Sequence, residues 1–231
     1  MAKINTNGNT YTIIYSSILV IVVAFLLAFV AQVLKPTQDA NVKNDVKNQI
    51  LTALNIETDD VEATFGKIVK DKLLVDEDFT DYDGEFLTTY GQAIKDGELH
   101  VFVATLDDGS TKYVIPMTGR GLWGGLWGYV ALNDDFSTVY GAYFSHESET
   151  AGLGALIAER PFQKRFIGKQ LFNDDPESQE VMLTVVKSGK VQNPDNEVDG
   201  ITGATLTTNG VAQMVKDGLQ IYVNALLGNN K

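Results

Sequence analysis

The chain has 231 residues, enough to bury one sizeable core without disulfide or metal crosslinks. It has no cysteine, which excludes iron–sulfur clusters, thiolate zinc sites, cysteine nucleophiles and disulfides, so any redox chemistry needs an organic cofactor. The net charge of -12 repels phosphate backbones and argues against nucleic-acid binding. The two histidines, His100 and His146, leave few imidazole ligands, and we predict no metal site.

The first element along the chain is an apolar segment near the N-terminus. Residues 11–34 form a run of 24 residues without a charged side chain. As a helix that rises about 1.5 Å per residue, this run is long enough to cross a hydrocarbon core of roughly 30 Å. A cleaved signal peptide is the alternative, but the run exceeds a usual signal-peptide core and no A-x-A cleavage site follows it. We therefore predict an N-terminal segment 1–35 with one transmembrane helix, then one domain at 36–231. The flanking lysines do not decide the orientation.

The next predicted element is a helix that follows Pro36 and is capped by Asp39. Apolar side chains recur there every four residues and define one face: Val42, Val46, Ile50 and Leu54. Five runs rich in β-branched and aromatic residues follow: 100–105, 112–117, 127–133, 136–145 and 181–187. Turn residues separate two pairs of these runs, which favours antiparallel pairing.

Helical signals return in the last third of the chain. Residues 155–172 read as helical pieces broken near Pro161. Residues 208–227 carry one apolar stripe: Val211, Val215, Leu219, Val223 and Leu226. We therefore predict an α+β domain with an antiparallel sheet and packed helices.

The segment 199–211, DGITGATLTTNGV, has four threonines and three glycines but no histidine, cysteine or lysine. One interpretation is a turn that leads into a helix capped by Thr207, Thr208 or Asn209. This interpretation accounts for only one or two of the hydroxyls. A helix N-terminus also presents free N–H groups and a positive partial charge, which favour a bound or covalently attached phosphate.

Residues 199–205 resemble the D-G-x-S/T-G-A-T motif at which bacterial flavin transferases attach FMN through a phosphoester to the last threonine. The resemblance implies that Thr205 carries covalent FMN. It also implies that the other motif residues contribute to the cofactor site: Asp199, Gly200, Thr202, Gly203 and Ala204. A separate enzyme performs the transfer, which explains why no base accompanies the threonines. The two glycines would leave room for that enzyme, and Asp199 would help to place the segment in it.

Residues 146–154, HESETAGLG, resemble the H-x-x-E-T-P-G-L-G loop of the FMN-binding domains in the respiratory Nqr and Rnf complexes, with Ala151 in place of proline. Without the resemblance, this stretch reads as a turn after a strand with a capping threonine. The resemblance implies flavin contacts from Glu149, Thr150, Gly152, Leu153 and Gly154, through backbone amides and the Leu153 side chain. We interpret Glu147 and Glu149 as a solvated edge on which one glutamate fixes the loop backbone, and not as a catalytic pair.

Residues 119–132, GRGLWGGLWGYVAL, predict a tight turn that leads into a strand, because each glycine costs a helix roughly 1 kcal/mol. Trp123 either stacks on a flavin, docks a partner or fills a hydrophobic plug under the loop. We place it among the candidate cofactor residues. The GLW stretch is more similar to the C subunits of Nqr than to the G subunits of Rnf.

The resemblance to the Nqr C subunits covers most of the chain. It implies an electron carrier with covalent FMN in a Na+-translocating NADH:quinone oxidoreductase that reduces ubiquinone. The implied partners are subunits of the A, B, D, E and F types, and a flavin transferase for maturation. The implied location is the bacterial inner membrane, with an extracytoplasmic, periplasmic FMN-binding domain. No complete catalytic site is expected in this chain alone.

Three alternatives remain at this level. The first is the G subunit of an Rnf complex, also an electron-transport protein. The second is a membrane-anchored extracytoplasmic ligand-binding module without covalent flavin, which has no need of the motif at 199–205. The third, a hydrolase with a threonine or serine nucleophile, lacks a convincing histidine partner. For an FMN carrier, Arg120 and Lys164 are candidate cations near the cofactor.

Overall fold

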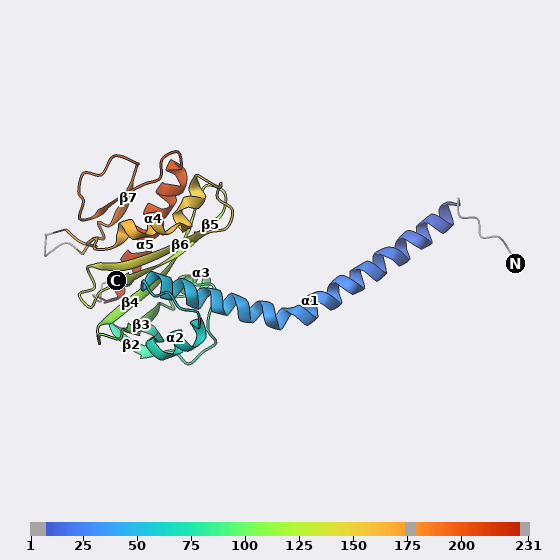
Figure 1. The fold of residues 1–231 in the computed structure, drawn as a ribbon, viewed down its shortest axis with the longest axis horizontal. Helices are drawn as coiled ribbons and strands as arrows, with labels where there is room; N and C mark the ends of the chain where they lie inside the picture. The colour runs from blue at the N-terminus through green and yellow to red at the C-terminus, as the bar shows by residue number, and fades with distance from the viewer. Residues whose placement is uncertain (1–7, 174–178, 227–231) are drawn as a thin grey trace. The chain divides into compact units, whose positions relative to one another are not determined.

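The computed structural model describes residues 8–173 and 179–226. The chain divides between Lys43 and Asn44 into two compact units. Helix α1 (Asn9–Ala53) begins in the first unit, where apolar side chains from Ile13 to Leu34 are exposed (Figure 1). Among the described residues, α1 is the one helix that is long and apolar enough to cross a membrane. This agrees with the predicted span at 11–34.

The prediction of a second helix that begins after Pro36 is wrong. Helix α1 continues through Pro36, and Asp39 pairs with Lys35 one turn earlier, with 3.3 Å between Lys35 Nζ and Asp39 Oδ1, instead of capping a helix. Proline removes one backbone hydrogen bond, but burial of the last turns of α1 stabilises the helix beyond it. On the predicted apolar face, Val46, Ile50 and Leu54 are buried and Val42 is exposed.

The second unit contains a six-stranded antiparallel sheet in the order β2-β1-β3-β4-β5-β6 (Figure 1). Its strands are β1 (Val69–Val75), β2 (Asp78–Asp81), β3 (His100–Thr105), β4 (Thr111–Arg120), β5 (Gly125–Leu132) and β6 (Val139–His146). The four predicted runs between 100 and 145 correspond to β3 to β6, and their antiparallel pairing is confirmed. The fifth run yields only β7 (Thr184–Val186), which pairs in parallel with β8 (Glu197–Asp199) in a separate two-stranded sheet.

Helices cover the sheet. They are α2 (Val61–Ile68), α3 (Gly91–Lys95), the 3-10 helix η1 (Gly154–Ala158), α4 (Arg160–Gln163), the 3-10 helix η2 (Lys164–Phe166) and α5 (Thr205–Leu226). The predicted break near Pro161 is confirmed, because η1, α4 and η2 replace one continuous helix. The helical pieces end at Phe166 and not at 172, because Gln170 forms a β-bridge with Thr138. Helix α5 begins three residues before the predicted 208, so Thr205 is its first residue.

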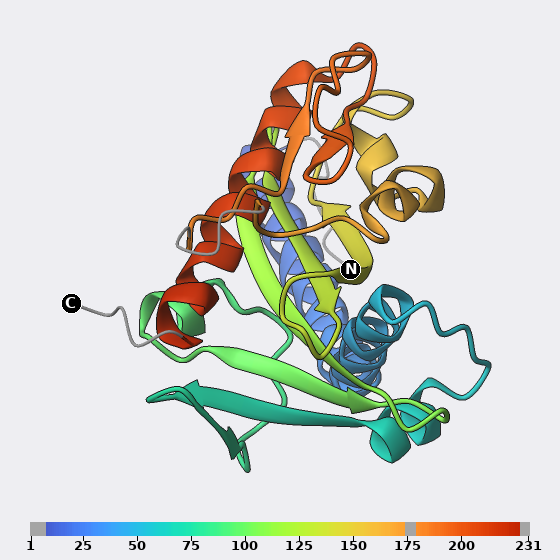
Figure 2. The same cartoon turned by 90° about the vertical axis from the view of Figure 1, so that its left-hand side faces the viewer.

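The hydrophobic core of the second unit lies on both faces of the sheet. On one face, Val211, Val215 and Leu219 of α5 pack with buried residues of β4 to β6. Figure 2 shows α5 running beside the sheet. The two elements approach closely at Gly210, where an added Cβ would lie 2.4 Å from the Arg120 carbonyl oxygen. On the opposite face, Ile50 and other residues from the end of α1 pack with aromatic residues of the strands. Each fully buried aliphatic or Phe side chain contributes about 1.5–3 kcal/mol.

A polar pair on the adjacent strands β3 and β1 consists of buried His100 and partly exposed Asp71. His100 is fully buried, and its Nδ1 lies 2.9 Å from Oδ1 of Asp71. We expect Asp71→Ala to lower the free energy of unfolding by about 2 kcal/mol, because the buried His100 would lose its hydrogen-bond partner. Urea unfolding of the full chain in detergent measures this change. Asp81→Ala is the matched control on the neighbouring strand, since the Asp81 side chain is exposed, and its effect should be much smaller. Equal effects would contradict the assigned role of this pair.

Candidate functional site

The glycine-rich turn before α5 is held by specific backbone contacts. The Asp199 Oδ1 atom accepts a hydrogen bond of 2.7 Å from the Gly189 N–H. An added Cβ at Gly200 would lie 2.4 Å from the Val186 carbonyl oxygen, so only glycine fits there. Gly203 has a φ of +80°, in the left-handed region that glycine adopts without strain. These contacts place Thr205 at the first position of α5.

The four threonines of the segment differ in accessibility. Thr207 and Thr208 are buried; Thr207 Oγ1 donates to Glu149 Oε2 at 2.6 Å, and Thr208 Oγ1 accepts from the Ile201 N–H at 3.3 Å. Thr202 and Thr205 are exposed, but the Thr202 hydroxyl lies 2.9 Å from that of Ser188. The Thr205 hydroxyl has no hydrogen-bond partner among the described residues. Of the four threonine hydroxyls, it is therefore the one that is both exposed and free of a hydrogen bond.

The prediction that Thr207, Thr208 or Asn209 caps α5 is wrong, because the helix already begins at Thr205. Thr207, Thr208 and Asn209 lie within the helix and not before it. The first N–H groups of α5, from Thr205 onwards, are therefore not capped by these side chains. Such a helix start carries a positive partial charge and favours a phosphate group.

Glu149 connects three segments of the site. It is 7% exposed, and its carboxylate accepts hydrogen bonds from the Trp123 N–H at 2.9 Å and from the Thr207 hydroxyl. Its own N–H donates to His146 Nδ1 at 3.2 Å. The exposed Glu147 holds the same turn, through a hydrogen bond of 3.0 Å that its Oε2 accepts from the Gly125 N–H. A glutamate that fixes the loop backbone was expected, but the interpretation of Glu149 as solvated is wrong.

The pKa of Glu149 reflects these contacts. Burial alone would raise it, but hydrogen bonds from the Thr207 hydroxyl and from the backbone N–H groups of Trp123 and Leu122 outweigh burial and lower the pKa below its usual 4.5. The carboxylate therefore stabilises the fold fully above pH 4.5, and this contribution is lost as the pH falls through the lowered pKa.

We expect the difference in the free energy of unfolding between the unaltered chain and Glu149→Gln to be constant near neutral pH. It should shrink below pH 4.5, as the unfolded state binds a proton that the folded state does not. Urea titrations at a series of pH values measure it, and the subtraction removes the contribution of the other acidic groups. A difference that grows on acidification would contradict the lowered pKa.

A cavity of about 180 Å³ opens between the loop after β6 and the start of α5. It brings together these predicted site residues: Glu149, Thr150, Leu153, Gly154, Gly203, Ala204 and Thr205. Three more lining residues were not predicted: Leu122, Leu206 and Thr207. The side chains of Leu122, Leu153 and Leu206 are 47%, 42% and 59% exposed, so the cavity has an apolar and accessible rim.

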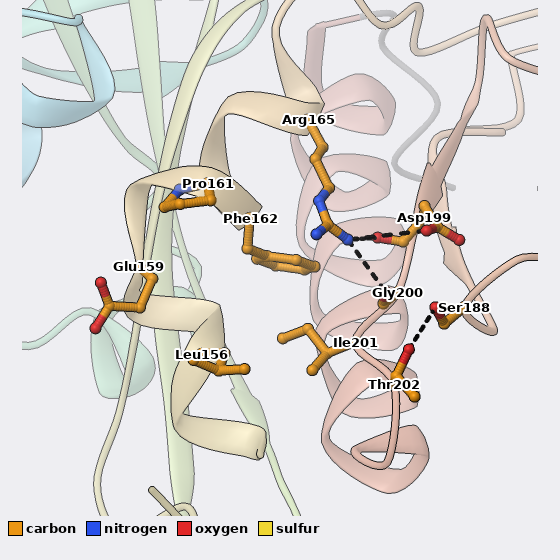
Figure 3. A pocket seen from close by; sticks show the side chains of 10 residues that line it. All are labelled: Leu156, Glu159, Pro161, Phe162, Arg165, Ser188, Asp199, Gly200, Ile201 and Thr202. Carbon is orange, nitrogen blue, oxygen red and sulfur yellow. Dashed lines mark hydrogen bonds and ion pairs between the residues drawn. The ribbon is translucent and has the colours of Figure 1, made fainter. Parts of the chain in front are cut away.

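The other predicted residues lie outside this cavity. Asp199, Gly200 and Thr202 line a neighbouring cavity of about 470 Å³ (Figure 3). Gly152 lies in the turn before η1 with a φ of +74°. The Trp123 side chain is 65% exposed, which rules out the interpretation of a hydrophobic plug. The predicted turn that leads into a strand is confirmed, because the Gly121 N–H donates to the Gly124 carbonyl at 2.9 Å just before β5.

The site fits a phosphorylated planar ring system. The free N–H groups of α5 suit a phosphate at Thr205, and the three leucines suit an aromatic ring. The cavity is smaller than the roughly 300–1,000 Å³ of pockets that enclose a ligand, so such a ring would remain partly exposed. An added Cβ at Gly154 would lie 2.4 Å from Thr207 Oγ1, so this glycine allows the loop to approach the helix. The part of the chain that the structure describes has no group of three or more His, Asp or Glu side chains arranged for a metal ion.

Comparisons with known proteins identify the family of the chain. The sequence model of the FMN-binding domain family matches residues 121–220. The C subunit of the Na+-translocating NADH-quinone reductase of Haemophilus ducreyi is 34% identical over 240 residues, which cover 94% of this chain and 91% of that protein. The corresponding protein of Vibrio alginolyticus is 38% identical over 111 residues, 48% of this chain and 42% of that one.

Solved structures show the same similarity. The crystal structure of the C subunit of this reductase from Parabacteroides distasonis has a TM-score of 0.73 and 35% identity, over 84% of this chain and 96% of that chain. Shewanella oneidensis NqrC has a TM-score of 0.69 and 25% identity, over 82% of this chain and 99% of that chain. The chain therefore belongs to the family of the C subunits of Na+-translocating NADH-quinone reductases, and it contains their FMN-binding domain.

Proposed function

We propose that this chain is the electron-carrying C subunit of a Na+-translocating NADH:quinone reductase, with FMN linked through a phosphoester to Thr205. The observation that supports the linkage is the position of Thr205. Its hydroxyl is exposed at the first residue of the 22-residue helix α5 and beside the apolar cavity. Of the other threonines in the segment, two are buried and one is hydrogen-bonded to Ser188.

In the proposed attachment step, Thr205 Oγ forms a bond to the phosphorus of a flavin nucleotide donor. The bond between that phosphorus and its leaving nucleotide breaks, and the threonine proton passes to a base of the flavin transferase. The product has the mass of the chain plus FMN less one water. No base from this chain is required, which agrees with the absence of histidine, cysteine and lysine from residues 199–211.

The residues around Thr205 would bind and orient the attached group. The free N–H groups of α5 stabilise the phosphate, and Leu122, Leu153 and Leu206 provide an apolar surface for the ring. Glu149 fixes the loop, the turn and the helix relative to one another. Bound FMN supplies reversible one-electron chemistry. A covalent bond allows the ring to stay exposed to a donor and an acceptor without being lost.

The setting is a membrane complex. We propose that the segment 1–35 anchors the chain in the bacterial inner membrane and that residues 36–231 form the periplasmic FMN-binding domain. An anchor of this kind keeps the carrier at a high effective concentration beside its partners. Those partners are reductase subunits of the A, B, D, E and F types, in a complex that passes electrons from NADH to ubiquinone and moves sodium ions. Both curated relatives described above are C subunits of Nqr, which favours this assignment over the Rnf G subunit.

The proposal is tested by the intact mass of the full chain after co-expression with a flavin transferase, measured in denaturant. We expect a gain of one FMN less one water. An unmodified mass, from a transferase that is active on a control substrate, would contradict the proposal. A membrane-anchored ligand-binding module would then be the better interpretation.

A further inference from the structure

Arg165 reaches the turn that precedes Thr205 from a distant segment of the chain. It lies on η2, and its Nη1 donates hydrogen bonds to the carbonyl oxygens of Asp199 at 2.8 Å and of Gly200 at 3.0 Å (Figure 3). The same nitrogen lies 4.0 Å from Asp199 Oδ2. The sequence offered Arg120 and Lys164 as candidate cations, but the structure brings Arg165 to the motif.

A second set of contacts holds the turn from its other side. Asp199 Oδ1 accepts from the Gly189 N–H, and the hydroxyls of Ser188 and Thr202 lie 2.9 Å apart. The Ala204 N–H then donates to the Ile201 carbonyl at 3.1 Å and closes the turn into α5. The backbone before Thr205 is thus fixed between η2 and the segment after β7, and Arg165 provides the contact from η2.

We propose that Arg165 is a positioning residue for the covalent attachment of FMN to Thr205, an inference that rests on the proposed function. Arg165 does not touch Thr205. It holds the Asp199–Gly200 backbone, and through the closed turn it keeps Thr205 in the conformation that the transferase binds. A binding partner that recognises one conformation has an apparent affinity reduced by the fraction of chains that populate it. Loss of Arg165 should therefore weaken recognition of the chain and leave the chemical step unchanged.

The contacts of Arg165 explain why this position suits an arginine. A planar guanidinium donates in fixed directions, so one nitrogen can serve two neighbouring carbonyls while the group lies near an aromatic ring. The Cζ atom of Arg165 is 5.7 Å from the centroid of the Phe162 ring. Both residues also line the cavity of about 470 Å³, so removal of the side chain would leave an open space that a small cation can enter.

The experiment measures the rate of FMN attachment to the full chain in detergent, at a series of chain concentrations, with a purified flavin transferase. We expect Arg165→Ala to raise the KM for the chain on the order of ten-fold, the change for loss of charge-assisted hydrogen bonds, with kcat within about two-fold. Lys164→Ala is the matched control, because Lys164 is an exposed cation on the same η2 segment. It should leave the KM unchanged.

Two further measurements separate positioning from a general loss of structure. Millimolar guanidinium should lower the KM of Arg165→Ala towards that of the unaltered chain and leave Lys164→Ala unaffected, whereas general unfolding would not be rescued. Arg165→Lys, which keeps the charge, should give an intermediate KM. Thermal unfolding of each variant verifies that the domain is folded.

The outcomes are distinct. An unaltered chain that is never modified contradicts the proposed function itself. A modified unaltered chain with an unchanged KM for Arg165→Ala, or with equal losses for Arg165→Ala and Lys164→Ala, contradicts only the positioning role. Faster modification of Arg165→Ala also overturns it, because Arg165 would then restrain a segment that must open.

Discussion

Replacement of Glu149 by alanine is expected to lower the free energy of unfolding by about 3 kcal/mol. The carboxylate is buried and accepts hydrogen bonds from the Trp123 N–H and the Thr207 hydroxyl, so its removal leaves both donors without a partner. The turn at 121–124 would also lose a contact that ties it to α5. Urea unfolding of the full chain in detergent at neutral pH measures the loss.

Glu147→Ala is the control for this prediction. Glu147 lies two residues earlier, holds the same turn through the Gly125 N–H and is exposed. Solvent replaces most of what an exposed carboxylate provides, so this variant should lose much less stability. If the two variants lose the same amount, Glu149 does not connect the three segments as described.

Thr205→Val is expected to abolish covalent FMN while the domain remains folded. Valine has nearly the shape of threonine but no hydroxyl, and Thr205 is exposed, so neither packing nor a buried hydrogen bond is lost. Flavin that stays with the denatured chain should fall from one FMN per chain to none. Mass and flavin absorbance after denaturation measure this, and thermal unfolding confirms the fold.

Thr202→Val is the control within the same motif. Thr202 is also exposed, but its hydroxyl is engaged with Ser188. With excess transferase this variant should still reach one FMN per chain, because the acceptor at the start of α5 is intact. Loss of the contact with Ser188 should only slow the attachment. Loss of FMN from Thr202→Val with retention in Thr205→Val would reverse the assignment of the acceptor.

Much of the fold is visible in the sequence because local patterns decide it. The runs rich in β-branched and aromatic residues, with the turns between them, correctly predict the antiparallel strands β3 to β6. The apolar stripe of α5 correctly predicts a packed helix. Strands β1 and β2 carry many charged residues, such as Lys70, Asp71 and Lys72, and their pattern does not reveal a strand. The pairing of β1 with β3 stabilises it as a strand instead. The continuity of α1 through Pro36 likewise depends on packing that a local rule does not contain.

The candidate site also contains residues that short sequence motifs predict and contacts that only the folded chain creates. Short motifs predict Thr205, its glycines and the loop at 149–154, because each motif is contiguous in the chain. The bond between Glu149 and Thr207 joins residues 58 positions apart, and the contact of Arg165 with Asp199 joins residues 34 apart. Neither pairing has a local signature, so only the three-dimensional structure reveals the burial of Glu149 and the contact of Arg165 with Asp199.

The central claim is that FMN is attached to Thr205 and to no other residue. The most direct measurement is fragmentation mass spectrometry of the tryptic peptide 191–216, taken from the full chain after co-expression with a flavin transferase. This peptide contains all four threonines of the segment: Thr202, Thr205, Thr207 and Thr208. The account predicts that the fragment masses increase by FMN less one water between Ala204 and Leu206. An increase at another threonine, or a flavin on a different peptide, would contradict the account.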